Sequence, residues 1–317
     1  MLLPLVWAAC VIAGCLYALH QNIPWSMTLK AFPAFLLEAT FFYALALERV
    51  RARIEKLAPA LIALALTAAA VAPYCAESLA FRTFRVGSLA EIALLAAAVS
   101  FWYVFLPKKP LSDVFFLVFI GVIWLAKILP PLYPRPNPRL PLEALAQAMW
   151  FRTCLFAMVS LRRPSGVGFG FWPKAREWRI GALYFLWFVP LALALGYFIA
   201  FGKPRFPGNP PWTTVAALAT FFGTLWILAL GEEFFFRGLL QQWMSSWLHS
   251  EWAGWLIASL IFGAAHLWYR QFPNWKIAAM AALHGACCGL AFRSARSIRA
   301  PMVTHALVVT AWRIFFA

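Results

Sequence analysis

The sequence predicts an all-α protein that crosses a membrane many times. Hydrophobic residues make up 64% of the 317-residue chain and charged residues 12%, whereas charged residues are about a quarter of an ordinary soluble domain. The apolar residues lie in continuous runs of roughly the 17–25 residues that an α-helix needs to cross a bilayer. A transmembrane β-barrel would instead have short segments of alternating polarity. The predicted fold class is therefore a polytopic α-helical membrane protein.

About eleven apolar segments follow one another, each long enough to be considered as a span. They cover residues 2–19, 31–47, 57–74, 88–106, 111–130, 142–160, 180–201, 213–248, 251–269, 277–293 and 300–316. The largest polar break, residues 161–179, separates the leading segments from the tail. We therefore expect two domains: residues 1–163, whose role the sequence does not indicate, and residues 164–317, which hold the candidate functional residues.

The charge pattern favours a membrane partner over nucleic acid. The net charge is +16, but the basic residues lie between the apolar runs, where they set topology and contact anionic lipid headgroups. No basic face or nucleic-acid-binding motif accompanies them. The six cysteines lie mostly inside apolar runs and form no CxxC pair, so we expect small packing residues rather than disulfides or a zinc ribbon.

The segment "GEEFFFRGLL", residues 231–240, places three charged residues in an apolar helix. A charge at bilayer depth costs at least about 2.5–3.5 kcal/mol, so such residues are treated as functional by default. Glu233 and Arg237 are four apart and can pair on one helix face. Glu232 points about 100° away from Glu233, without a local partner. It is therefore the candidate general base.

Complementary imidazole groups lie on the following apolar segments. His266 and Phe262 share a helix face, and His266 follows the turn near Ser250 by 16 residues, while Glu232 precedes it by 18. At about 1.5 Å per residue, both lie roughly 24–27 Å from that turn. His305 falls short of this level by on the order of 10 Å if the helices are straight. For His284, beside Gly285 and Gly289, an interhelical hydrogen bond at a packing seam is the favoured interpretation.

These motifs resemble those of the CAAX prenyl endopeptidase and bacteriocin-processing family (CPBP, or Abi) of intramembrane proteases. "EEFFFRG" is similar to the EExxxR signature of that family, "FGAAH" to its FxxxH motif, and "RAPMVTHAL" to its final motif. The resemblance covers roughly residues 180–317. It implies that Glu232 and His266 activate a water, that Glu233 and Arg237 support them, and that His305 helps to stabilise the oxyanion.

One position departs from the family pattern. The family usually has Asn four residues after the last His, and here that position is Val309. The side chain of Val cannot donate a hydrogen bond, so either another donor substitutes or the chain belongs to a subgroup. The Val-bearing tail resembles the CAAX-protease-related branch linked to exosortase sorting systems. In that branch the substrates would be membrane-tethered proteins with C-terminal sorting segments.

The favoured function is therefore an intramembrane endopeptidase of a bacterial inner membrane, with a membrane-anchored protein or peptide as substrate. Two alternatives are a non-catalytic scaffold or maturation factor that keeps the fold, and a proton-coupled transporter, for which no paired broken helices are visible. Glu232, His266 and His305 could form a zinc site, because catalytic zinc takes three such ligands and a water. No HExxH motif occurs, and we expect no metal and no other cofactor.

Overall fold

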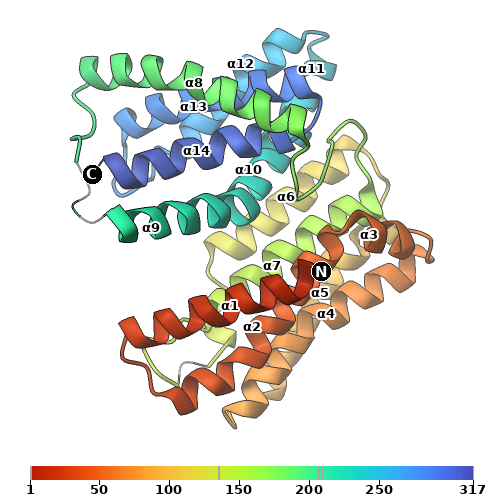
Figure 1. The fold of residues 1–317 in the computed structure, drawn as a ribbon. Coiled ribbons are helices and arrows are strands. Elements are labelled where there is room, and N and C mark those ends of the chain that lie inside the picture. Colours follow the sequence, from red (N-terminus) through yellow and green to blue (C-terminus); the bar gives the residue numbers. More distant parts are fainter. Residues whose placement is uncertain (1, 135, 206–207, 209, 317) are drawn as a thin grey trace. The chain divides into compact units, whose positions relative to one another are not determined.

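The computed structural model describes residues 2–134, 136–205, 208 and 210–316. It is 78% helical, and the described residues form no strand, so the predicted all-α class is confirmed. The chain divides into two compact units, Met1–Arg163 and Pro164–Ala317, coloured red to green and green to blue in Figure 1. Each unit is described by itself.

The first unit consists of hairpins of apolar helices that end in a π-helical turn. Its helices are α1 (Leu2–His20), α2 (Trp25–Ala46), α3 (Glu48–Ile54), α4 (Pro59–Ala80), α5 (Val86–Phe105), α6 (Pro110–Leu125), the 3₁₀ turn η1 (Pro130–Leu132), α7 (Glu143–Phe156) and the π-helix η2 (Ala157–Arg162). Two ion pairs are buried here. Arg152 contacts both oxygens of Glu38, at 2.6 and 3.0 Å, and Arg162 contacts both oxygens of Asp113, at 2.8 and 3.0 Å.

The second unit holds every candidate site residue. Its elements are α8 (Ala175–Phe198), α9 (Pro210–Gly223), the π-helix η3 (Thr224–Leu228), α10 (Ala229–Glu233), the π-helix η4 (Phe234–Gln241), α11 (Gln242–Trp247), α12 (Glu251–Ala265), α13 (Trp275–Ala295) and α14 (Arg299–Phe315). Side-chain caps start two of these helices: Ser250 accepts from the backbone N–H of Ala253, and Asn274 accepts from that of Ile277.

Each of the eleven apolar segments is largely helical, but the structure does not confirm eleven membrane spans. By length and composition, eight helices among the described residues could cross a membrane. Helices α6 and α12 have 16 and 15 residues, whereas a straight span needs about 20. Helix α14 has 17 residues and carries Arg299, His305 and Arg313. These three helices account for the difference between the eleven expected spans and the eight candidate spans.

The long apolar segment from Trp212 to Trp247 is continuous but not uniform. Helix α10, which carries Glu232 and Glu233, lies between the π-helices η3 and η4. A π-helix has its hydrogen bonds between residues i and i+5, and such turns within α-helices frequently occur at functional sites. The apolar pattern predicts a straight α-helix here, because hydrophobic periodicity does not distinguish the two forms over so few residues.

Two glycines of α13 let the neighbouring helices approach closely. A Cβ added to Gly289 would lie 2.6 Å from Trp255, and one added to Gly285 would lie 3.3 Å from both Arg237 and Phe262. The backbone oxygens at both positions accept hydrogen bonds from η4. Arg237 donates to Gly285 at 2.9 Å, and Gln241 donates to Gly289 at 3.3 Å. Because Gly285 and Gly289 have no side chain, α13 can pack closely against its neighbours, and its backbone oxygens are accessible to Arg237 and Gln241 of η4.

Candidate functional site

A buried ion pair anchors the candidate site. Glu233 is 0% and Arg237 1% exposed, and Arg237 Nε lies 3.1 Å from Glu233 Oε2. Arg237 also donates from Nη1 to Glu233 Oε1 at 3.3 Å, and its guanidinium carbon lies 4.7 Å from the centre of the Phe262 ring. The predicted pairing of Glu233 with Arg237 is therefore present. A buried pair of this kind is stable only when its remaining donors and acceptors are also satisfied.

His305 completes this arrangement from α14. Its Nδ1 lies 2.7 Å from Glu233 Oε1, which makes Nδ1–H the donor to a carboxylate and leaves the lone pair of the neutral ring on Nε2. Nε2 lies 3.9 Å from Glu232 Oε2. His305 therefore contacts both glutamates of the motif.

The expected 10 Å shortfall of His305 was wrong. That expectation assumed that the last helix begins at the same depth as the turn near Ser250. In the structure a Cβ on Gly238 would lie 3.4 Å from Ile298, so the residue that precedes α14 packs against the middle of η4. The last helix therefore begins deeper than assumed, and His305, seven residues after Ile298, lies alongside Glu233.

Glu232 differs from Glu233 in the way the sequence suggested. Its side chain is 28% exposed, while its Oε2 is buried and has no hydrogen-bond partner among the described residues. It lines a cavity of about 660 Å³. A carboxylate oxygen beside a cavity, close to an imidazole and without a partner of its own, can accept a proton from a water or substrate held there.

His266 lies one residue beyond the end of α12. Its Nδ1 is 2.8 Å from the backbone oxygen of Phe262, so Nδ1–H is the donor. His266 lines the same cavity as Glu232 and His305. The Phe262 ring, 1% exposed, has its centre 4.7 Å from the His266 ring and 6.1 Å from the His305 ring. Phe262 therefore packs near both imidazoles, and its supporting role stays a prediction.

His284 is more closely involved than the sequence suggested. Its ring centre lies 4.5 Å from that of His305, at an interplanar angle of 80°, and it lines the cavity. The expected interhelical hydrogen bond is not formed through Nε2, which is buried without a partner among the described residues. The ring instead packs against Phe188 and Phe262. The spacing of His284 and Gly285 indicated a helix seam, but not that the seam borders a cavity.

Val309 also lines the cavity, one helical turn beyond His305. The rest of the wall is mostly apolar and comes from α8, α13 and α14, including Phe185, Val189, Leu193 and Met280. Helix α8 has few buried residues of its own. The cavity thus joins a small set of ionisable groups to a large apolar surface, as ligand sites commonly do.

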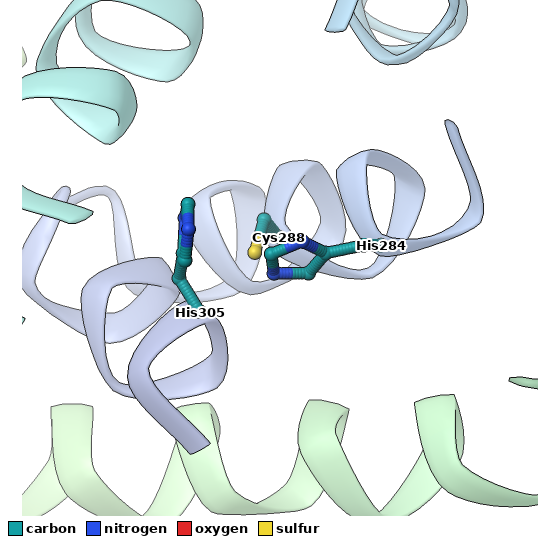
Figure 2. A group of neighbouring side chains, drawn as sticks. All are labelled: His284, Cys288 and His305. Atoms are coloured by element: carbon teal, nitrogen blue, oxygen red, sulfur yellow. The ribbon is translucent and has the colours of Figure 1, made fainter. Parts of the chain in front are cut away.

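Three ligand atoms converge closely enough to be compared with a metal site. One atom each of His284, Cys288 and His305 lies within 4.8 Å of the others, and all three residues are buried. Figure 2 shows the Cys288 sulfur between the two imidazole rings. The zinc set considered from the sequence, Glu232, His266 and His305, shares one residue with this group. His284 and Cys288 are four residues apart on α13, so they share a helix face, but their convergence with His305 of α14 is not visible from spacing along the chain.

The fold and the site together define a polytopic membrane protein with a cavity lined by carboxylate and imidazole groups. Residues 213–311 match the family model described as Rce1-like, type II CAAX prenyl endopeptidase Rce1-like. This segment is an Rce1-like domain of the CPBP family, and it contains all the candidate site residues. No curated protein and no solved structure matches the chain. The family match supports a peptidase at the level of its general class.

Proposed function

We propose that the chain is an intramembrane endopeptidase in which Glu232 is the general base for an attacking water. The observation that carries the proposal is the contrast within one motif. Glu233 is buried and contacts Arg237 and His305, whereas the partly exposed Glu232 lines the cavity. Oε2 of each glutamate is buried without a hydrogen bond among the described residues, so the difference lies in the access of Glu232 to the cavity. Glu232 is therefore free to take a proton.

The reaction follows from these positions. Glu232 takes a proton from a water, and the resulting hydroxide attacks the scissile carbonyl carbon, with His266 on the same cavity wall helping to orient it. The negative charge moves to the carbonyl oxygen, which His305 can stabilise only when Nε2 also carries a proton, because Nδ1–H is already donated to Glu233. Glu232 then returns the proton to the leaving nitrogen as the C–N bond breaks. Positioned acid–base groups of this kind contribute about 10²–10⁴-fold.

Glu233 and Arg237 act through His305. The hydrogen bond from Nδ1 to Glu233 fixes the orientation of the imidazole, and Arg237 holds Glu233 in place through two further contacts. The pair does not need to touch substrate for this. It keeps His305 Nε2 directed towards Glu232.

The apolar cavity wall supports the proposed substrate class. Apolar walls over much of a 660 Å³ cavity favour a peptide segment that already lies in the lipid, such as the hydrophobic end of a membrane-anchored protein. Val309 gives the wall an apolar surface where relatives usually have Asn. We include in the proposal that the substrates have C-terminal sorting segments, as in the exosortase-linked branch, and that the membrane is a bacterial inner membrane.

A scaffold or maturation factor that keeps the fold is the second candidate. Val309 is the observation that favours it, because loss of one oxyanion donor can cost about 2.7–4 kcal/mol of transition-state stabilisation.

The test is cleavage by the purified chain in lipid vesicles, together with membrane proteomics of cells that carry each variant. Glu232→Gln and His266→Ala should each abolish turnover and cause the same precursor to accumulate. The matched control is Glu251→Gln, the same change at a half-exposed residue that pairs with Arg293 and Arg296, which should cleave normally. Near-normal turnover in Glu232→Gln would remove Glu232 as the base. No cleavage by the folded wild type, with no precursor dependent on Glu232, would favour the scaffold.

A further inference from the structure

We propose that His284, Cys288 and His305 form a binding site for a zinc-type divalent cation in the wall of the cavity. This inference rests on the proposed function only for what the ion would do, and not for whether it binds. The three residues come from α13 and α14, and one ligand atom of each lies within 4.8 Å of the others. Among the described residues, His305 contacts the two glutamates, and neither His284 nor Cys288 takes part in an ion pair.

The donor atoms suit such an ion. Imidazole nitrogen and thiolate sulfur are the usual zinc ligands, and sites that bind substrate or water have three protein ligands and an open position. Zinc bonds of about 2.0–2.3 Å in a tetrahedron hold their ligand atoms about 3.3–3.8 Å apart. Binding would therefore draw the three atoms inward by about 1 Å. His284 and His305 both line the cavity, which gives the ion a route in and an open side.

An unpaired nitrogen marks the site independently. His284 is 7% exposed, and its Nε2 is buried without a hydrogen-bond partner among the described residues. A buried polar atom left unpaired costs about 1–3 kcal/mol, and a missing ion is one of the recognised explanations. A cation at this position would give the nitrogen a partner.

The surroundings of His305 match those of a metal ligand. Histidines that bind metals almost always donate the other ring N–H to a carboxylate or a backbone oxygen, which fixes the tautomer. Here Nδ1 of His305 donates to Glu233 at 2.7 Å, and Nε2 keeps its lone pair. Arg237 holds Glu233 in turn. The arrangement is complete before any ion binds.

A divalent cation would balance the local charges once Cys288 has lost its proton, which its complete burial beside Glu233 opposes in the absence of an ion. With both glutamates ionised and Cys288 bound as thiolate, Glu232, Glu233 and Cys288 contribute three negative charges, and Arg237 offsets one of them. Two positive charges bring the sum to zero, which lowers the cost of keeping these groups in an apolar environment. When bound, the ion would supply positive charge beside the reacting carbonyl, and Glu232 would remain the base.

Cys287 provides the matched control for Cys288. The two cysteines are neighbours on α13, and both are buried. Cys288 Sγ faces α14, with the Pro301 backbone oxygen at 3.7 Å. Cys287 packs instead with Phe188 and Val308 in an apolar cluster. Serine at either position removes one buried sulfur from the same helix, so the two variants should differ only in metal binding.

The experiment is titration of the full, untagged chain in detergent with Co²⁺, after a chelator has removed bound metal and without substrate. Wild type and Cys287→Ser should bind about one ion per chain and develop the near-ultraviolet absorption of a thiolate bound to cobalt. Cys288→Ser should lack that absorption. His284→Ala should weaken binding by about tenfold or more. Melting with and without Zn²⁺ gives a second measurement, because a ligand that binds only the folded state raises Tm.

A thiolate band of equal strength in Cys288→Ser, or no band in the folded wild type, would overturn the metal site. If Cys288→Ser does not fold, His284→Ala decides: Zn²⁺ should raise the Tm of wild type and Cys287→Ser, and an equal rise in His284→Ala would also overturn the proposal. Failure of the proposed function leaves a different pattern. A chain that binds one cobalt ion through Cys288 but cleaves no peptide keeps the site and loses the peptidase.

Discussion

The buried ion pairs of the two units are built from the same residue types but differ in what surrounds them. In the first unit Arg152 contacts both oxygens of Glu38 and also the backbone oxygen of Ala69 at 2.9 Å. In the second unit Arg237 shares Glu233 with His305, and a second glutamate stands beside the pair. In the first pair Arg152 Nη1 is buried without a hydrogen-bond partner among the described residues, and no histidine takes part in these contacts of Arg152 and Glu38, whereas the second pair holds a further ionisable group, His305, in place.

Each unit also contains a glutamate with an unpaired carboxylate oxygen, which extends the comparison. Glu77 of α4 is fully buried, and neither of its oxygens has a hydrogen-bond partner among the described residues. Glu232 also has an unpaired oxygen, but its side chain lines a cavity with three histidines. The lesson is that an unpaired buried carboxylate is not by itself a catalytic group. It needs room for a reactant and a neighbouring group that can share the proton.

The largest expected effect separates these two glutamates. Glu232→Gln should reduce turnover by about 10²–10⁴-fold, the contribution of a positioned general base, whereas Glu77→Gln should leave turnover unchanged. Because Glu232 and His266 act on one water, the Glu232→Gln/His266→Ala double variant should be no worse than either single variant. The measurement is single-turnover cleavage in vesicles. Equal losses of turnover in Glu77→Gln and Glu232→Gln would show that a place beside the cavity does not distinguish the catalytic glutamate from the other.

The arginines test the two pairs directly. Arg152→Ala and Arg237→Ala each remove the arginine from a buried carboxylate, a loss that costs about 3–5 kcal/mol of stability in comparable pairs, although Glu233 keeps its contact with His305. Both should lower Tm in detergent, but among molecules that remain folded only Arg237→Ala should also lose turnover, because His305 loses its anchor. Glu233→Gln with Arg237→Met should recover part of the Tm. An Arg237→Ala chain that melts like wild type but does not cleave would make Arg237 a ligand of the substrate or transition state.

His305 should show an effect of the next size. His305→Ala removes one group beside the developing oxyanion and should cut turnover by about 10²–10³-fold. The phenylalanine at position 262 gives a comparison on the same imidazole, since Phe262→Leu keeps apolar bulk but loosens the packing of the rings. It should raise KM and lower kcat by less than His305→Ala. Unchanged turnover in His305→Ala would leave Glu232 and His266 without their third member.

The smallest effect on maximal rate is expected at Val309. It lies one turn from His305 and lines the cavity, so Val309→Asn should be accepted without loss of Tm. The new amide adds a donor where the wall is apolar and should change which peptides are cleaved more than how fast the best is cleaved. Turnover of wild type and Val309→Asn on a panel of membrane-anchored peptides measures this. An identical ranking of peptides by both chains would exclude Val309 from the substrate-binding wall.

The sequence predicted most of this fold because its information is local. Apolar runs located the helices, and the i, i+4 spacing predicted the Glu233–Arg237 pair. What it missed depends on how helices meet. Two features arise between helices: the contact of Ile298 with η4, which brings His305 to Glu233, and the convergence of His305 with the His284 and Cys288 pair of α13. The π-helical turns around Glu232 also escaped, since a one-residue change in hydrogen-bond register leaves the apolar pattern nearly intact.

The apolar cavity wall changes which reactant, peptide or water, is in short supply for the proposed hydrolysis. In the proposed reaction the peptide is dissolved in the same lipid phase as the enzyme, so its encounter rate depends on how many copies share a given area of membrane. The scarce reactant is water. An ordered water needs two to four polar partners, and the groups that line this cavity include the ionisable side chains of Glu232, His266, His284 and His305. A substitution of any of these groups therefore changes the hydration of the cavity as well as its chemistry. The dependence of the cleavage rate on solvent isotope and on osmotic pressure should then change with the residues that line the cavity.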